Sequence, residues 1–410
     1  MVGHFMLLRS ELIVSILTEW LPLKSTTLVD SALCSHCYRE IWLQTLKCWC
    51  ILPIVSLQLQ KWRSLLNWLC SRSIRAKKLE LYSMGMYDLC QCAILSKWLS
   101  TTANAVRSVT FLNDCSAFVP TILQHCTQLR ELEVNNFRGF SFWNIVRNNP
   151  SLAVLKLKET HGKIFNAPSS TLQSVLELTI CVDSVMLRYF LSHMSALTHL
   201  VLLGTPKNLP SLASCARLIS LNLRDTHLTE DQLVQLVSSL PVGLRKFVFP
   251  FVEEQPKRQK GYYRNRALLA VWPLHAQSLE CLEICYRMDW RIAELINSCV
   301  VLHTLVIRTS CHKSSWPAPN ISKVLNPSIR TLHIDNCDAS TFATIKANFS
   351  NVTTLGFMNT DRNLVCEHVR GILSACNKVL LVYTDFCVPM ELRKRKQLMV
   401  YKTYLTRNLF

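Results

Sequence analysis

The sequence predicts an α/β solenoid, in which short parallel strands form the inner, concave layer and helices form the outer layer. Two observations support this prediction. A short apolar phrase returns along most of the chain, and the residues between its copies have a helical pattern. Only 9 of the 410 residues are glycine, so the chain is expected to be ordered throughout. A chain that is 50% hydrophobic and has no Pro/Gly/Ser-rich linker can bury a large core along its length.

The recurring phrase begins as CTQLRELEVNN at residue 126 and returns as CARLISLNLRD at 215, CVVLHTLVIRT at 299 and CNKVLLVYTDF at 376. Its apolar positions follow the pattern L-x-x-L-x-L. From Val106 onward, successive copies are 21 to 27 residues apart, except for one step of 35. This period is typical of leucine-rich repeats. The copies open at Val106, Leu129, Leu152, Val175, Leu197, Leu218, Leu244, Leu279, Leu302, Ile329, Val352 and Val379, with a weaker copy at Ala76.

Each copy predicts a strand followed by a helix. The L-x-L part predicts the strand, because alternate residues face opposite sides and both leucines then point inward. In TEDQLVQLVSSL, Thr229 is expected to cap the helix, with Gln232 at the matching third position. One such unit cannot cover its own apolar face, so neighbours must stack. We predict about 12 to 13 units over residues 76–390, with an insertion at 250–272.

Two repeat positions hold small side chains. A cysteine that recurs three residues before the first apolar residue is expected to be a core residue and not a reactive one. These cysteines are Cys126, Cys215, Cys299 and Cys376. Eight residues after the first apolar residue, small side chains are suited to hydrogen-bond the turns between repeats. These are Thr160, Thr205, Thr226, Ser310, Cys337 and Thr360. The pattern resembles the cysteine-containing, ribonuclease-inhibitor-like branch of leucine-rich repeats.

The formal net charge is +18, and residues 61–80, 251–270 and 391–410 carry 13 of these charges. The predicted strands instead mix both signs, which does not make a groove that tracks phosphates. We therefore expect a protein target on the concave face, and nucleic acid is not an expected partner. The residues predicted to form this partner-binding face are Glu131, Glu133, Lys156, Lys158, Arg224, Arg308, His333 and Asp335.

Two basic segments leave alternatives open. The insertion at 250–272 contains Tyr262, Tyr263 and Arg264, which are able to stack on bases, although a solvated loop is the simpler interpretation. The basic C-terminal cap or tail at 391–410 contains LRKRKQ, which suits a nuclear-localisation patch, an anionic surface or a solvated end of the last repeat.

The first residues do not fit a signal peptide, because the apolar run Phe5 to Leu8 is short and leads into Arg9 and Glu11. The most apolar stretch, Ile41 to Gln60, is interrupted by a lysine, a proline and glutamines, so no membrane span is expected. With 19 cysteines and no sign of secretion, a reducing intracellular location is expected, either cytoplasmic or nuclear.

No motif predicts catalysis. The sequence contains neither a phosphate-binding glycine loop nor a G-x-S-x-G elbow, so we expect no enzyme activity and no cofactor. The nearest pattern to a metal site is CSHC at 34 followed by CWC at 48. Structural zinc prefers paired C-x(2–4)-C knuckles, and CWC is too tight for the second knuckle, so no metal is expected.

The segment before the repeats, residues 6–46, predicts a small all-α module. In LRSELIVSILTEWLPL, apolar residues recur at steps of three and four, which indicates an amphipathic helix. Ser10 is expected to cap it and Pro22 limits its length. A second helical series follows in STTLVDSALCSHCYREIWLQTL. Residues 47–75 are expected to be a linker or first capping segment.

The N-terminal module resembles an F-box, and an F-box followed by leucine-rich repeats is a recurring family architecture. The resemblance implies a substrate receptor of a Skp–cullin–F-box ubiquitin ligase, in which the N-terminal helices dock on the adaptor subunit. The residues in the matching places, which the resemblance assigns to adaptor binding, are Leu8, Glu11, Leu12, Ile16, Leu17, Trp20 and Leu21. The alternative is a leucine-rich-repeat scaffold, or a structural subunit of a larger assembly, whose N-terminal helices only cap the solenoid.

Overall fold

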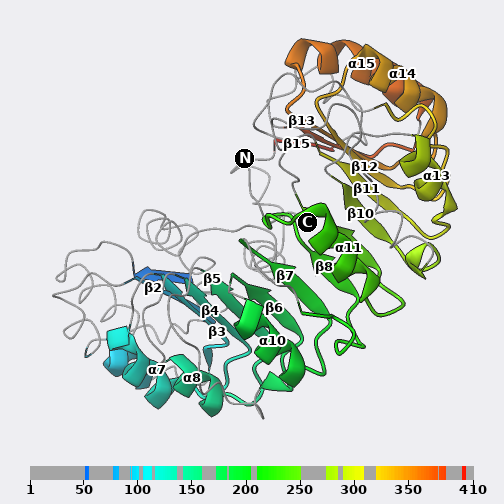
Figure 1. Cartoon of the computed structure of the whole chain (residues 1–410). Coiled ribbons are helices and arrows are strands. Elements are labelled where there is room, and N and C mark those ends of the chain that lie inside the picture. Colours follow the sequence, from blue (N-terminus) through cyan, green and yellow to red (C-terminus); the bar gives the residue numbers. More distant parts are fainter. Residues whose placement is uncertain are drawn as a thin grey trace, which may run out of the picture. The chain divides into compact units, whose positions relative to one another are not determined.

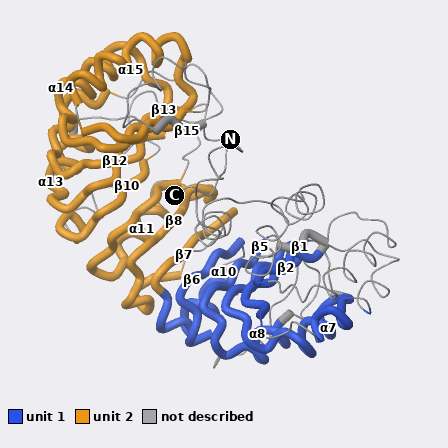
Figure 2. The backbone as a smooth tube through the Cα atoms, turned by 180° about the vertical axis from the view of Figure 1, so that it is seen from behind, with its two compact units in different colours: residues 1–197 blue, residues 198–410 orange. Residues whose placement is uncertain are grey.

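The computed structural model describes residues 51–54, 77–82, 93, 95–100, 105–112, 116–135, 142–158, 172–181, 184–204, 210–250, 274–284, 290–308, 320–376, 378–384 and 399–402. The chain divides into two compact units, residues 1–197 (unit 1) and residues 198–410 (unit 2), coloured separately in Figure 2.

In unit 1 the strands follow one another in chain order, and each is parallel to the next. They are β1 (Ile51–Ile54), β2 (Lys78–Tyr82), β3 (Ser108–Leu112), β4 (Glu131–Asn135), β5 (Val154–Lys158) and β6 (Glu177–Ile180). The helices lie on one side of this strand layer (Figure 1). They are the 3-10 turn η3 (Ser116–Phe118), α7 (Val119–His125), α8 (Phe142–Asn148) and α10 (Ser184–His193).

Unit 2 has the same plan, with its strands in chain order and parallel. They are β7 (His199–Leu202), β8 (Ser220–Asn222), β9 (Lys246–Val248), β10 (Cys281–Ile284), β11 (Thr304–Ile307), β12 (Thr331–Asp335), β13 (Thr354–Met358), β14 (Leu381–Thr384) and β15 (Met399–Lys402). Its helices are α11 (Glu230–Ser238), α13 (Trp290–Ser298), α14 (Ala339–Asn348) and α15 (Arg362–Ala375).

The α/β repeat part of the predicted fold class is confirmed, because each unit is an array of parallel strands in chain order at the leucine-rich-repeat spacing, with helices in several of the connections. The strands reach further than the predicted solenoid at 76–390. β1 lies within the segment predicted as a linker, and β15 lies within the predicted basic tail. The N-terminal module at 6–46 and nearly all of the insertion at 250–272 lie outside the described residues.

The L-x-L leucines fill the core as the pattern predicts. On β4, for example, Leu132 and Val134 are fully buried, whereas Glu131 and Glu133 face the other side. The register aligns these core positions from strand to strand, so that Leu132 stands beside Leu155 on β5. Burying one such leucine contributes about 1.5–3 kcal/mol relative to leaving it exposed. The apolar rows therefore hold the strands in a single register.

A backbone ladder joins the repeats where each strand begins. In unit 1, the amide of Arg130 donates to the carbonyl of Arg107 at 2.7 Å, and that of Ala153 donates to the carbonyl of Arg130 at 2.8 Å. In unit 2, the same position links Ile219 to Thr198 at 2.9 Å and continues repeat by repeat to Leu380 and Thr353, also at 2.9 Å. Each of these bonds pairs a backbone amide of one repeat with a backbone carbonyl of the preceding repeat, so neighbouring repeats satisfy each other's polar groups.

The recurring cysteines are core residues, as predicted: Cys126, Cys215, Cys299 and Cys376 are all buried. Burial raises the pKa of Cys126 and of Cys299 to about 12, so that both thiols stay protonated at neutral pH. A protonated, buried thiol is a poor nucleophile. These cysteines therefore act as small packing residues and not as reactive groups.

Two repeats replace this cysteine by a buried asparagine, a device that the sequence pattern did not reveal. The amide of Asn149 donates to the carbonyl oxygens of Cys126 at 3.1 Å and Ile145 at 2.8 Å, and its Oδ1 accepts the Leu129 amide at 2.7 Å. Asn326 also donates to two carbonyls, those of Ile296 at 2.6 Å and Cys299 at 2.7 Å, which both lie in the preceding repeat. The side chain thereby satisfies carbonyls at the end of a helix.

The small side chains expected at the turns make the predicted bonds wherever they are described. Thr226 donates to the carbonyl of Leu223 at 2.6 Å. Thr360 accepts the amide of Cys337 at 3.1 Å, which links two repeats. Thr160, Thr205 and Ser310 lie outside the described residues.

The residue just before this position adopts a left-handed backbone in several repeats. Gly204 has φ 82°, Asn336 has φ 55° and Asn359 has φ 49°. Glycine and asparagine are the residues that tolerate this conformation best. The predicted cap of α11 is also confirmed, since Thr229 accepts the Gln232 amide and the Gln232 side chain accepts the Thr229 amide.

A serine immediately before the first apolar residue forms a further link between repeats. Its hydroxyl donates to the carbonyl of the first apolar residue of the preceding repeat. The pairs are Ser151 to Leu129 at 3.4 Å, Ser174 to Leu152 at 2.9 Å, Ser278 to Leu244 at 2.9 Å and Ser328 to Leu302 at 2.8 Å. This serine ladder occurs in both units and was not predicted from the sequence.

The serine ladder predicts a stability difference between two Ser→Ala substitutions. Ser174→Ala removes a bond between repeats and should lower the free energy of unfolding by about 1 kcal/mol. Ser238→Ala is the control, because that hydroxyl bonds only within its own exposed helix turn and alanine is the better helix former. Urea unfolding of both variants measures the difference. Equal midpoints would contradict the ladder.

Candidate protein-binding strand faces

The strand side chains that point away from the helices of unit 1 form a charged surface, which we call the unit 1 face. They stand on alternate residues of β2 to β6, opposite the core leucines. Its residues are Lys78, Glu80, Ser108, Glu131, Glu133, Lys156, Lys158 and Glu177. Three lysines and four glutamates give this face a net charge of −1, within a chain whose net charge is +18.

The centre of the unit 1 face is a bonded group around Glu131. Lys156 Nζ lies 2.6 Å from Glu131 Oε1, and the Ser108 hydroxyl donates to Oε2 at 2.9 Å. Partial burial alone would raise the pKa of Glu131, but the Lys156 ammonium and Ser108 offset this, and the pKa is lowered. The pKa of Lys156 is raised, since Glu131, Glu133 and Glu177 outweigh the effect of burial. Both groups are charged at neutral pH.

A second ion pair repeats this geometry, with Lys158 Nζ 2.8 Å from Glu133 Oε1. In the strand register Lys156 stands beside Glu133 but its ion pair is with Glu131, and Lys158 stands beside Asn135 but its ion pair is with Glu133. Both ion pairs therefore run diagonally between β4 and β5. Lys78 and Glu80 form a further pair along β2 at 3.3 Å. The structure thus brings together Glu131, Glu133, Lys156 and Lys158, four of the residues predicted to bind a partner.

The corresponding row in unit 2, which we call the unit 2 face, is mostly uncharged and buried. Register places its members side by side on neighbouring strands. From β8 to β14 they are Asn222, Val248, Glu283, Val306, His333, Gly356 and Tyr383. Val248, Glu283, Val306 and His333 are all buried, so this face differs physically from the unit 1 face.

Two arginines predicted to bind a partner meet on this face at a buried carboxylate, that of Glu283. Arg224 donates from Nε to Glu283 Oε1 at 2.8 Å and from Nη2 to Oε2 at 2.5 Å. Arg308 Nε lies 2.7 Å from Oε1. The exposed fractions of the side chains are 1% for Glu283, 12% for Arg224 and 24% for Arg308. Glu283 is not among the predicted partner-binding residues, although an acidic residue in the middle of a buried L-x-L was a usable signal.

His333 and Asp335 on β12 are both buried, unlike the predicted residues of unit 1. The His333 ring lies over Gly356, where an added Cβ would be 1.8 Å from His333 Nδ1. Its centroid is 5.8 Å from that of Tyr383. Burial, and then the charge of Arg308, lowers the pKa of His333 to about 4, so the ring is neutral at physiological pH.

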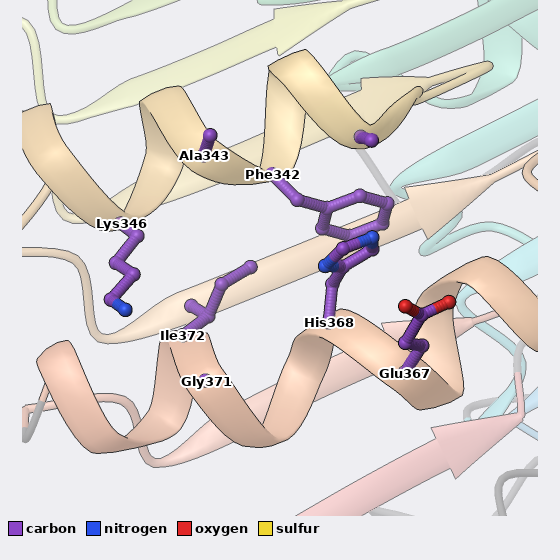
Figure 3. Close-up of a pocket in the computed structure, with 8 residues that line it drawn as sticks. Phe342, Ala343, Lys346, Glu367, His368, Gly371 and Ile372 are labelled. Carbon is purple, nitrogen blue, oxygen red and sulfur yellow. The ribbon is translucent and has the colours of Figure 1, made fainter.

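A small groove of about 250 Å³ lies in the helix layer between α14 and α15. Figure 3 shows the rings of Phe342 and His368 facing each other across it, with centroids 5.2 Å apart. Lys346 and Glu367 stand at its two ends, and Gly371 leaves part of its wall open. The residues that line the groove belong to the helix layer of unit 2 and not to the unit 2 face.

Neither a metal centre nor a membrane span is found within the described ranges. No three side chains among His, Cys, Asp and Glu there are placed to hold a metal ion. None of the helices described is both long enough and apolar enough to cross a bilayer. The CSHC and CWC segments and the seven residues assigned to adaptor binding lie outside these ranges.

No family model and no curated protein matches this chain. Among solved structures, an internalin (inlF) from Listeria monocytogenes is 13% identical, covering 83% of this chain and 93% of its own, with a TM-score of 0.37. A Bacteroides fragilis protein is 13% identical over 80% of this chain and 74% of its own, with a TM-score of 0.21. The InlJ functional domain from L. monocytogenes, which includes a cysteine ladder, is 11% identical over 75% and 72%, with a TM-score of 0.26.

All three TM-scores are low, so the fold assignment rests on the strand topology and register of this chain. The F-box resemblance and the ribonuclease-inhibitor-like subtype stay predictions.

The packing of His333 on Gly356 predicts opposite effects for two Gly→Ala substitutions. Gly356→Ala should lower the free energy of unfolding by about 1–3 kcal/mol, because the His333 ring must move. Gly371→Ala should raise it by about 0.5–1 kcal/mol, since that helical position has open space. Chemical denaturation measures both. In a His333→Ala background the cost of Gly356→Ala should shrink; an unchanged cost would show that the ring is not the obstacle.

Proposed function

We propose that this protein binds a partner protein, using the strand faces of its leucine-rich repeats. The observation that carries the proposal is the fixed ion-pair array of the unit 1 face. Alternating acids and bases there suit the mixed charges of a protein surface and do not suit a phosphate backbone. The proposal assigns no catalytic chemistry to this chain.

The ion pairs also favour binding because they hold flexible side chains in place. Free lysine and glutamate side chains lose rotamer entropy when a partner immobilises them, at about 0.5–1.5 kcal/mol each. Here Glu131 is held by Lys156 and Ser108, and Glu133 is held by Lys158. A partner therefore meets a pattern of charge that is already ordered, which supports specific recognition.

The finer proposal is that the chain is the substrate-recognition subunit of a Skp–cullin–F-box type ubiquitin ligase. What supports it is the resemblance of residues 6–46 to an F-box, followed by leucine-rich repeats. In this role the N-terminal helices bind the adaptor, the strand faces hold the target, and the protein works in the cytoplasm or nucleus.

A second role, that of a scaffold whose N-terminal helices only cap the array, has one observation in its favour. β1 stands at the end of the strand order in unit 1, and within the described residues its strand neighbour is β2. An open strand edge and an uncovered end of a repeat array both need to be shielded. In the scaffold role, residues 6–46 would supply this shield.

Charge reversal tests the strand-face proposal. Glu133→Lys should reduce partner capture by the full-length protein at least tenfold, because it places like charges beside Lys158 and in front of the partner. The double variant Glu133→Lys/Lys158→Glu restores the ion pair, so it should fold normally and still fail to capture. Quantitative pull-down with mass spectrometry measures the loss.

The matched control is Glu294→Lys, which reverses an exposed charge on α13 in the helix layer. It should capture the same partners as the wild type. Normal capture by the double variant would contradict the proposal.

Substitution in the N-terminal module separates the receptor role from the cap role. If residues 6–46 bind the adaptor, Leu12→Asp or Ile16→Asp should abolish co-purification of the adaptor subunit while the far-UV circular dichroism and urea midpoint stay unchanged. If they only cap the array, the same variants should destabilise unit 1. Absence of the adaptor from wild-type pull-downs would reject the ligase role.

A further inference from the structure

The charges of unit 1 are divided unevenly between its strand face and its other surfaces. All four acidic residues that the structure describes in this unit belong to the unit 1 face, together with three of the nine described lysines and arginines. The other six basic residues lie elsewhere in the unit. They are Lys77, Lys97, Arg107, Arg130, Arg147 and Arg188. Over residues 1–197 as a whole, 19 lysines and arginines stand against 12 aspartates and glutamates, so the excess is positive in the complete unit as well.

Three of these six residues form a row, which we call the basic row. Lys77 directly precedes β2, Arg107 precedes β3 and Arg130 precedes β4. The backbone ladder places them side by side, since the Arg107 amide donates to the Lys77 carbonyl at 2.8 Å and the Arg130 amide donates to the Arg107 carbonyl at 2.7 Å. Neighbouring strands are about 4.8 Å apart, so the three residues are spread over about 10 Å. The ladder continues to Ala153 and Leu176, which are uncharged, so the row ends after three cations.

The basic row has no acidic partner in the described part of the chain. Lys77 and Arg130 are exposed and Arg107 is half-buried. Arg107 Nη1 donates to a backbone carbonyl of the next repeat at 3.3 Å, and none of the three side chains takes part in an ion pair there. Glu131, which follows Arg130 in the chain, is held on the unit 1 face by a lysine and a serine. Three like charges are therefore neighbours at the edge where the strands begin.

The same repeat position in unit 2 shows how a carboxylate is bound in such a row. The residues there are Arg245, Glu280, His303 and Arg330, joined by the same backbone ladder. Glu280 Oε1 lies 3.4 Å from Arg245 Nη1, and its Oε2 lies 3.7 Å from His303 Nε2. One carboxylate in this row thus reaches the side chains of both neighbouring repeats. The basic row of unit 1 has basic side chains on neighbouring repeats but no carboxylate between them.

We propose that the basic row binds a short run of aspartate or glutamate residues in the partner protein. This inference deepens the proposed protein-binding function and rests on it. Carboxylates placed among the three cations relieve their mutual repulsion, as Glu280 does between its neighbours in unit 2. Side chains on one face of an extended segment are about 6.5–7 Å apart, so two or three acidic side chains match a row of about 10 Å.

The shortness of the row favours an acidic peptide segment over a nucleic acid. Binding of a single strand uses a positively charged groove that follows the phosphate backbone over several nucleotides. The basic row ends after three residues, and the unit 1 face beside it has a net charge of −1. A strand that continued along the ladder would pass uncharged Ala153 and then Leu176, which is followed by Glu177. A short acidic run needs only the row itself.

The test measures binding of labelled probes to the full-length protein by fluorescence anisotropy at one fixed ionic strength. The acidic probe is hexaglutamate, amidated at its C-terminus and labelled with fluorescein. Hexaglutamine, capped and labelled in the same way, is its neutral analogue and should bind at least tenfold more weakly. A labelled oligothymidylate of six nucleotides presents phosphates in place of carboxylates.

The decisive variant is Lys77→Gln/Arg107→Gln/Arg130→Gln. It should weaken hexaglutamate binding roughly tenfold, because each exposed ion pair that is lost contributes a factor of about two to five. The matched control, Lys97→Gln/Arg147→Gln/Arg188→Gln, removes the same charge from exposed positions on the helices of unit 1. It should change binding less than about twofold, so a general loss of positive charge is distinguished from loss of the row.

Circular dichroism and the urea midpoint confirm that each variant is folded. The backbone ladder uses main-chain atoms only, so both triple variants should keep the wild-type midpoint. If the row variant does not fold, Arg130→Gln takes its place and Arg188→Gln becomes its control, since both side chains are exposed. The single substitution should weaken hexaglutamate about two- to fivefold.

Four outcomes would overturn the inference. They are no binding of hexaglutamate to the wild type, equal binding of hexaglutamate and hexaglutamine, equal weakening by the row variant and its control, and oligothymidylate binding that is tighter than hexaglutamate and is lost in the row variant. The capture experiment on Glu133 and Lys158 uses residues outside the row. A failure here with the expected loss of capture there therefore rejects the basic row and leaves the proposed function standing.

Discussion

The backbone ladder between successive repeats is the interaction on which the rest of the structure depends. At the start of most of the described strands, one amide donates to the carbonyl at the same position of the preceding repeat, for example Arg130 to Arg107 and Arg330 to His303. This bond fixes the register, and the register decides which side chains face the core. Serine hydroxyls and buried asparagine amides reinforce it at the same edge, so neighbouring repeats satisfy each other's polar groups.

The strands of both units are paired in the same parallel register, but the side chains on the two strand faces differ chemically. In unit 1 it places lysines and glutamates on neighbouring strands, where they pair diagonally and stay partly exposed. In unit 2 it places valines, Gly356 and His333 in the equivalent row, where Glu283 is the charged member and is buried. The unit 1 face therefore presents paired, partly exposed charges, whereas the row on the unit 2 face is mostly uncharged and buried.

Much of the architecture could be predicted from the sequence, because the repeat constrains it strongly. The L-x-L periodicity predicted the strands, the recurrence of cysteine at one repeat position predicted the buried thiols, and Thr229 followed by Gln232 predicted the helix cap. The serine ladder escaped notice because serine alone at one position is a weak signal. Burial of His333 was not predictable, because it requires the missing Cβ of Gly356 on the next strand. The pairing at Glu283 depends on Arg224 reaching across β9, and strand alternation alone does not show this.

The most direct test of the account is lysine footprinting of the full-length chain, free and in complex with a captured partner. Lys156 and Lys158 are about a third exposed in the free chain, at 32% and 38%, so both should be acetylated. Binding on the unit 1 face should protect both, while Lys346 on α14 and Lys323, both exposed, should react equally in the two states. Protection of Lys346 with unchanged labelling of Lys156 and Lys158 would place the partner on the helices and contradict recognition by the strand face.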